Sequence, residues 1–158
     1  MPDGFELDSR AGAFGRWWRI YDEVLDPRVV RQSTPVSCHS ACGEMLSDGR
    51  ITQAQLLEVL GEGMKTPQQV FETLDSFQVG HYRSRLFEPE TQYEILLYAR
   101  FMAFVYAADQ GNLHAVVVEV NSSGRLTVLD PWDGTKYDVL EKDFFDTMWS
   151  GMAIWKVE

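Results

Sequence analysis

One cysteine stands where a thiol can become a nucleophile. Cys38 follows an extended stretch over 29–37 and opens a predicted helix of sequence Cys-His-Ser-Ala-Cys-Gly-Glu-Met-Leu. The unpaired N–H groups at the start of a helix favour negative charge, so they lower the pKa of a thiol placed there. A small cysteine buried in a helix would give the same local pattern, and the assignment therefore depends on other residues.

Gln32 supplies a group that an acyl-transfer site needs beside its nucleophile. It lies six residues before Cys38. When a nucleophile attacks a carbonyl carbon, the oxygen becomes negative, and hydrogen-bond donors aimed at it stabilise the transition state. The Gln32 amide and the backbone N–H of Cys38 could provide two such donors. Taken by itself, Gln32 is better explained as a surface loop residue.

A histidine and an aspartate lie on two strands that we expect to pair. His114 begins the apolar run His-Ala-Val-Val-Val-Glu-Val, and Asp130 follows the next predicted strand, across a turn of sequence Asn-Ser-Ser-Gly over 121–124. Pairing about this turn brings His114 opposite residue 130, within two positions. The carboxylate could then accept a proton from the imidazole and fix its tautomer and orientation. A register shift of one residue would send Asp130 to the other face.

The order Gln32, Cys38, His114 and Asp130 resembles the papain-like cysteine proteases. In that family a glutamine precedes the nucleophile by six residues and an Asn or Asp follows the histidine by about sixteen, as Asp130 follows His114. The resemblance implies a papain-like fold in which Cys38 attacks, His114 is the base, Asp130 orients it and Gln32 stabilises the oxyanion. Papain relatives read Asn-Ser-Trp where this chain reads Asp-Pro-Trp. Trp132 could therefore shield the hydrogen bond between His114 and Asp130 from water, and a tryptophan packed in the core explains this residue equally well.

Within this superfamily the pattern is most similar to peptidases that remove leader peptides from bacteriocins, and to papain-fold domains of bacterial effectors and toxins. The Asp-Pro pair and two capped helices after the cysteine helix resemble the first group, and the stretch over 130–137 resembles the second. The residue after the nucleophile departs from the pattern, because leader peptidases have glycine there, papains have tryptophan, and this chain has His39. We expect His39 to face solvent, although its imidazole could also lower the pKa of Cys38.

Hydrophobic spacing and turn signals indicate the elements that must position these residues. Aromatic residues at helical spacing predict an N-terminal helix over 12–25, which Asp26-Pro27 ends. Thr52 and Thr66 are predicted to cap two short helices, to residues 60 and about 77, after the one at Cys38. Helices are also predicted over 88–100 and 142–149, and strands over 81–86, 101–107, 113–120, 125–129, 135–140 and 152–157. Helices first and an antiparallel sheet second indicate an α+β fold, with an N-terminal helical half packed on a C-terminal antiparallel β-sheet.

Length and charge limit the classes of protein. A chain of 158 residues fits a single domain, which we divide into an extension over 1–29, a mainly helical half over 30–100 and a sheet half over 101–158. The net charge of −10 argues against nucleic-acid binding, which needs clustered Lys and Arg. We also expect no membrane span and no signal peptide, hence a cytoplasmic protein as encoded, or one that a secretion system delivers to another cell.

Several activities share one thioester intermediate on Cys38. Attack on a peptide bond followed by water gives a peptidase acting on a peptide or protein substrate, which is our first prediction. Attack on a glutamine side chain followed by water gives a deamidase, and an amine acceptor gives a transglutaminase. A catalytically inactive papain fold that binds a partner is a further alternative, and an immunity protein is a partner we consider for a toxin.

The residues Cys38, His39, Cys42 and His114 could also be read as a metal site. Structural zinc sites usually combine a close pair of ligands with a distant second pair, and the sequence does not supply that second pair. We therefore expect no metal and no cofactor, and we interpret Cys42 as a small packed residue.

Overall fold

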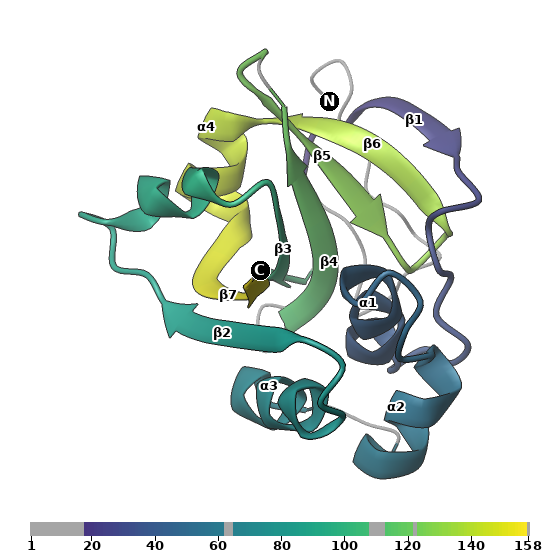
Figure 1. Cartoon of the computed structure of the whole chain (residues 1–158). Coiled ribbons are helices and arrows are strands. Elements are labelled where there is room, and N and C mark those ends of the chain that lie inside the picture. Colours follow the sequence, from purple (N-terminus) through teal and green to yellow (C-terminus); the bar gives the residue numbers. More distant parts are fainter. Residues whose placement is uncertain (1–17, 62–64, 108–112, 122, 158) are drawn as a thin grey trace.

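The structure is a computed structural model that describes residues 18–61, 65–107, 113–121 and 123–157 (Figure 1). Within these residues, seven strands form one antiparallel sheet in the order β1-β6-β5-β4-β3-β7-β2. The strands are β1 (Tyr21–Leu25), β2 (His81–Leu86), β3 (Arg100–Tyr106), β4 (Leu113–Val120), β5 (Arg125–Asp130), β6 (Thr135–Leu140) and β7 (Trp149–Val157). The helices are α1 (Cys38–Leu46), α2 (Gln53–Leu60), α3 (Pro67–Ser76), α4 (Glu141–Asp143), the 3-10 helix η2 (Gln92–Leu97) and the π-helical turn η3 (Phe144–Met148).

The central strands of the sheet, β3 and β4, are buried on both faces. Successive side chains of a strand point to opposite faces, so a strand covered on both sides is apolar throughout. In β4, Ala115 and Val117 join the core that contains residues of α1, α2 and α3, while Val116 and Val118 join the core that contains η2 and η3. Figure 1 shows α1, α2 and α3 grouped together and α4 on the other side of the sheet. The expected fold class, helices packed on an antiparallel sheet, is confirmed.

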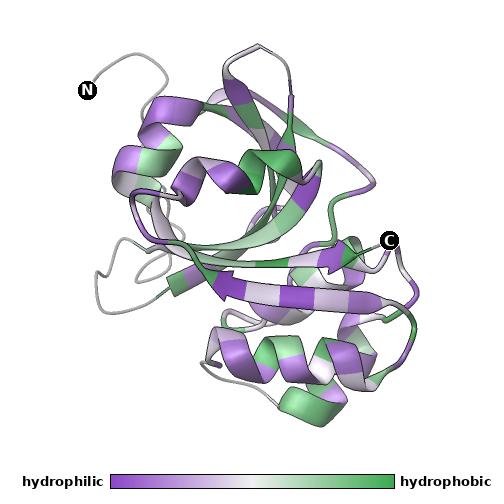
Figure 2. Cartoon of the chain, turned by 60° about the vertical axis from the view of Figure 1, so that its left-hand side comes forward, coloured by the Kyte–Doolittle hydropathy of each residue, from purple (hydrophilic) through white to green (hydrophobic). Residues whose placement is uncertain are grey.

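The helices after Cys38 begin where the sequence predicted. The Thr52 hydroxyl accepts a hydrogen bond from the Gln55 N–H, and the Gln55 side chain accepts one from the Thr52 N–H. Thr66 makes the same reciprocal pair of bonds, with Pro67 as the first helical residue. Hydrophilic and hydrophobic residues alternate along these helices in Figure 2, as expected for helices that bury one side.

The helix predicted over 12–25 is wrong in its described part, since Tyr21–Leu25 is the edge strand β1; residues 12–17 lie outside the described residues. Leu25 pairs with Thr135 of β6, and Trp18 is buried in the core beside η3. The aromatic spacing that suggested a helix thus reflects burial of one aromatic residue next to an edge strand. Pairing with β6, which is distant in sequence, overrides the local pattern.

Three other boundaries differ from expectation. The helix predicted over 88–100 is reduced to the short η2, and β3 already begins at Arg100. The helix predicted over 142–149 is α4 followed by η3, and Trp149 belongs to β7. The sheet also extends beyond the C-terminal part of the chain, because β1 and β2 form its two edges.

Candidate active site

Cys38 is the first residue of α1, and α1 packs against β4 (Figure 1). Its sulfur accepts a hydrogen bond from the backbone N–H of Ala115 at 3.4 Å. The ladder between β4 and β5 ends at the pair Val117 and Leu129, and the same register would place Pro131 opposite Ala115. The Ala115 amide lies past the end of that ladder, where it meets the thiol. Only 9% of Cys38 is exposed, so the residue is almost entirely buried.

His114 and Asp130 lie side by side. The distance from His114 Nε2 to Asp130 Oδ1 is 2.8 Å, and each side chain is 1% exposed. The register of β4 and β5 places them two positions off direct opposition and therefore on the same face, within the tolerance that the turn allowed. Because Asp130 holds Nε2, the nitrogen left for Cys38 is Nδ1, which is buried and has no hydrogen-bond partner among the described residues.

Asp130 receives further hydrogen bonds that the sequence did not predict. The backbone N–H of Trp132 donates to Oδ1 at 3.0 Å, and the Tyr137 hydroxyl donates to Oδ2 at 2.7 Å. The indole N–H of Trp18 donates in turn to the Tyr137 oxygen at 3.2 Å. Trp132 thus contacts Asp130 through its backbone, and shielding by its half-buried ring stays a prediction.

The electrostatics of the buried groups favour an ion pair. Burial raises the pKa of Cys38, but the neighbouring imidazoles of His114 and His39 and the Ala115 N–H outweigh it and lower the pKa to about 6. Burial lowers the pKa of His114, but the charge and hydrogen bond of Asp130 raise it to about 10. Burial raises the pKa of Asp130, and the imidazolium and its hydrogen bonds lower it below its ordinary value. Between about pH 6 and about pH 10 the site therefore holds a thiolate and an imidazolium.

Gln32 lies beside the turn that carries Asp130. Its backbone N–H donates to the Pro131 carbonyl at 2.7 Å, so this loop and the turn after β5 are bonded to each other. The side-chain nitrogen donates to the Thr34 carbonyl at 2.9 Å, and an amide nitrogen carries a second N–H that this bond does not use. Gln32 is 9% exposed, and its oxygen is buried with no hydrogen-bond partner among the described residues.

Gln53 holds the loop over 31–37, here called the Gln32 loop. Its side-chain oxygen accepts from the Ser33 N–H at 2.7 Å and from the Ser37 hydroxyl at 3.2 Å, and its nitrogen donates to the Arg31 carbonyl at 3.1 Å. No sequence pattern pointed to this role, because Gln53 is simply the polar first residue of α2. These three bonds hold the loop from the side of α2.

The expected solvent exposure of His39 is wrong. His39 is only 4% exposed, and its Nε2 is buried without a hydrogen-bond partner among the described residues. Cys42, one turn further along α1, is fully buried, and burial raises its pKa well above that of a free thiol. Cys42 is therefore a packed neutral thiol.

The described residues contain no group of three or more His, Cys, Asp or Glu side chains that could hold a metal ion.

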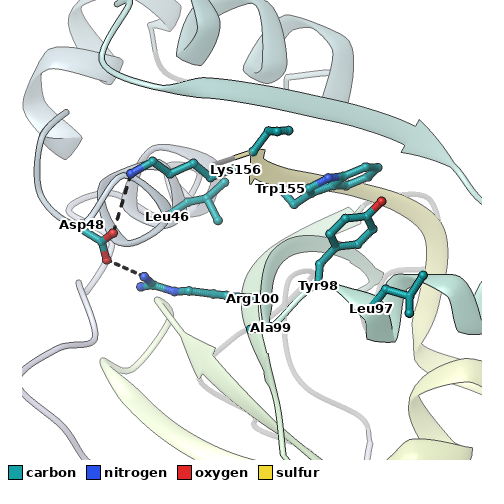
Figure 3. A pocket seen from close by; sticks show the side chains of 9 residues that line it. Leu46, Asp48, Leu97, Tyr98, Ala99, Arg100, Trp155 and Lys156 are labelled. Carbon is teal, nitrogen blue, oxygen red and sulfur yellow. Dashed lines mark hydrogen bonds and ion pairs between the residues drawn. The ribbon is translucent and has the colours of Figure 1, made fainter.

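A pocket of about 430 Å³ lies at the other end of α1, away from Cys38, and Figure 3 shows Tyr98 and Trp155 on one side of it and Asp48 on the other. Asp48 pairs there with Arg100 at 2.6 Å.

No helix in the part of the chain that the structure describes is long and apolar enough to cross a membrane.

The fold is the papain-like fold found in transporter peptidase domains. The peptidase domain of Streptococcus ComA, a bi-functional ABC transporter involved in quorum sensing, matches with a TM-score of 0.67 and 20% identity, over 82% of this chain and 96% of that domain. A double glycine motif protease from an AMS/PCAT transporter, solved with its leader peptide, matches with a TM-score of 0.64 and 15% identity, over 81% and 89%. At these identities the likeness concerns the fold.

At the level of sequence, the chain is similar to cysteine protease effector 1 of Escherichia coli O1:K1:H7. The two are 29% identical over 149 residues, which cover 92% of this chain and 30% of that protein. The chain thus spans less than a third of the length of this relative. No protein-family model matches the chain.

Proposed function

We propose that this chain is a cysteine peptidase domain in which Cys38 is the nucleophile, His114 the acid and base, and Asp130 the group that orients His114. One observation carries the proposal: the fold brings the three residues together. Asp130 bonds to His114 at 2.8 Å, and the Cys38 sulfur accepts a hydrogen bond from Ala115, the residue that follows His114 in β4. Support comes from the peptidase fold and from similarity to a cysteine protease.

In the proposed acylation step the thiolate attacks the carbonyl carbon of the scissile bond. The new C–S bond forms while the carbonyl oxygen takes the electron pair. The backbone N–H of Cys38 and the second side-chain N–H of Gln32, which the bond to Thr34 does not use, stabilise this oxygen. The Cys38 amide is available because the first N–H groups of a helix have no intrahelical acceptor. The imidazolium of His114 then gives its Nδ1 proton to the leaving amine, the C–N bond breaks, and a thioester remains.

Deacylation in this proposal runs through the same groups. Neutral His114 takes a proton from a water molecule, whose oxygen attacks the thioester carbon. The second tetrahedral intermediate collapses by expelling the Cys38 thiolate, and the product leaves with a new carboxylate. Asp130 keeps its charge throughout and stabilises the imidazolium in both steps, as in other triads.

The substrate we propose is an extended segment of a peptide or protein. The fold neighbour solved with a leader peptide supports this class of substrate. The name of the E. coli relative includes the word effector, which supports the further proposal that the domain acts after delivery to another cell and that an immunity protein blocks it in the producing cell.

The test is the iodoacetamide labelling rate of each cysteine against pH, read by mass spectrometry, for wild type and His114→Ala. We expect Cys38 to label with a midpoint near pH 6 in the wild type and to lose this low midpoint in the variant. Cys42 is the internal control, because its buried neutral thiol should label slowly in both proteins. A Cys38 with an ordinary thiol midpoint in the wild type would refute the proposal.

Incubation of a proteome with wild type and with Cys38→Ala then identifies the reaction. New N-termini that appear only with the wild type indicate a peptidase. A mass gain of about one dalton on glutamine residues, without new termini, would instead indicate a deamidase.

A further inference from the structure

The nucleophile has two histidines beside it. His39 follows Cys38 directly in α1, and His114 reaches it from β4. Each imidazole keeps one buried nitrogen without a hydrogen-bond partner among the described residues, Nε2 in His39 and Nδ1 in His114. More than nine in ten buried polar groups in proteins have such a partner, so two exceptions at one sulfur call for a common explanation.

We propose that His39 is a positioning residue that donates a hydrogen bond to the Cys38 thiolate and holds it together with His114. The inference rests on the proposed function, because it concerns the same nucleophile. Its geometric support is that His39 follows Cys38 directly at the start of α1, is only 4% exposed and keeps a buried nitrogen without a partner among the described residues. The His39 imidazole also lowers the pKa of the thiol.

Other ionisable groups near the sulfur do not account for this effect. From β5, Asp130 approaches the site behind His114, and its hydrogen bonds go to His114, Trp132 and Tyr137. On α1 itself, Cys42 is neutral, because burial raises its pKa. Glu44 on the same helix accepts from the N–H of Gln53.

The consequence concerns both halves of the reaction. A thiolate stabilised by two imidazoles is present at lower pH, and it is also a better leaving group when the thioester is hydrolysed. The donor in His39 stays in place while His114 passes its proton to the leaving amine. His39 would therefore set the acid limb of the pH profile, whereas Asp130 and His114 set the alkaline limb.

The experiment compares His39→Phe, which keeps a ring without its donors, with His39→Gln, which keeps a donor. The matched control is His81→Phe, since His81 is exposed on the edge strand β2. We expect His39→Phe to raise the Cys38 labelling midpoint by about one pH unit, so that labelling at pH 6 slows about fivefold. His39→Gln should recover part of this change, and His81→Phe should behave as wild type.

A second measurement needs no substitution of His39. The chain has three histidines, so nitrogen NMR can follow each imidazole against pH. The His39 signal should change as Cys38 ionises near pH 6, and Cys38→Ser should abolish that change.

The outcomes separate the two proposals. An unchanged midpoint in a folded His39→Phe, or a His39 signal that ignores Cys38, overturns the role of His39 and leaves the proposed function standing. An ordinary Cys38 midpoint in the wild type overturns the proposed function itself.

Discussion

Replacing Asp130 by asparagine removes one buried charge and keeps the shape of the side chain. Asparagine can still accept from His114 Nε2 and from the Trp132 N–H, the two bonds that Oδ1 now receives at 2.8 and 3.0 Å. Its NH₂ group would face the Tyr137 hydroxyl, which can accept as well as donate. We therefore expect Asp130→Asn to fold, with its main effect on the charge of His114.

The size of that effect follows from the contact. An opposite charge within hydrogen-bonding distance typically changes a pKa by about 1–3 units. We expect the His114 pKa to fall from about 10 by about two units, which corresponds to about 3 kcal/mol. His114 has a folded pKa above its unfolded value of about 6.5, so its stabilising contribution is fully present below that value and is lost as pH rises through about 10. In Asp130→Asn the same loss should occur about two units lower.

The assay is a nitrogen NMR titration of the histidines, supported by urea unfolding at a series of alkaline pH values. Asp138→Asn is the matched control, because Asp138 accepts a hydrogen bond from Thr127 at 2.9 Å on the neighbouring strand. It should leave the His114 midpoint unchanged. An Asp130→Asn variant whose His114 still titrates near 10, or a wild type whose His114 titrates near 6.5, would refute the electrostatic reasoning.

Three further predictions concern residues that support the site. Gln53→Ala should loosen the Gln32 loop and slow peptide hydrolysis about tenfold, which corresponds to about 1.4 kcal/mol, while the Cys38 labelling midpoint stays unchanged. A hydrolysis rate equal to that of the wild type would show that the loop keeps its conformation without Gln53. Tyr137→Phe removes the hydroxyl that donates to Asp130 and should lower the free energy of unfolding by about 2 kcal/mol in urea titration, and wild-type stability would contradict this. Gly43→Ala places a methyl group into the Leu56 side chain and should cost about 1–3 kcal/mol, which thermal unfolding can check; no change would mean that α2 shifts freely.

The three proposed catalytic residues were found from the sequence because local signals position them. A helix start predicts the place of Cys38, and a short hairpin limits how far His114 and Asp130 can lie apart. The alternation of residues in β6 also places Tyr137 on the buried side of that strand. Its burial could therefore be predicted from the sequence, although its bond to Asp130 could not.

The remaining contacts depend on parts of the chain that are distant in sequence. Trp18 bonds to Tyr137, which lies 119 residues further along the chain, and β1 pairs with the distant β6, so neither contact could be derived from spacing along the chain. The direction of His39 depends on how α1 is seated against β4, and a single helical position carries no signal for that. Tertiary packing decides these cases against local propensity.

The strand order has a consequence for the order of folding. The two edge strands are the first two of the seven along the chain, yet β1 pairs with β6 and β2 pairs with β7, the two strands that follow all the others. Contacts between segments far apart in sequence form slowly, because a long loop must close first. A ribosome-bound chain would already carry the cysteine helix while its histidine and aspartate strands were missing. The domain should therefore gain its reactive thiolate only after β4 and β5 have been made, in the step that completes the sheet.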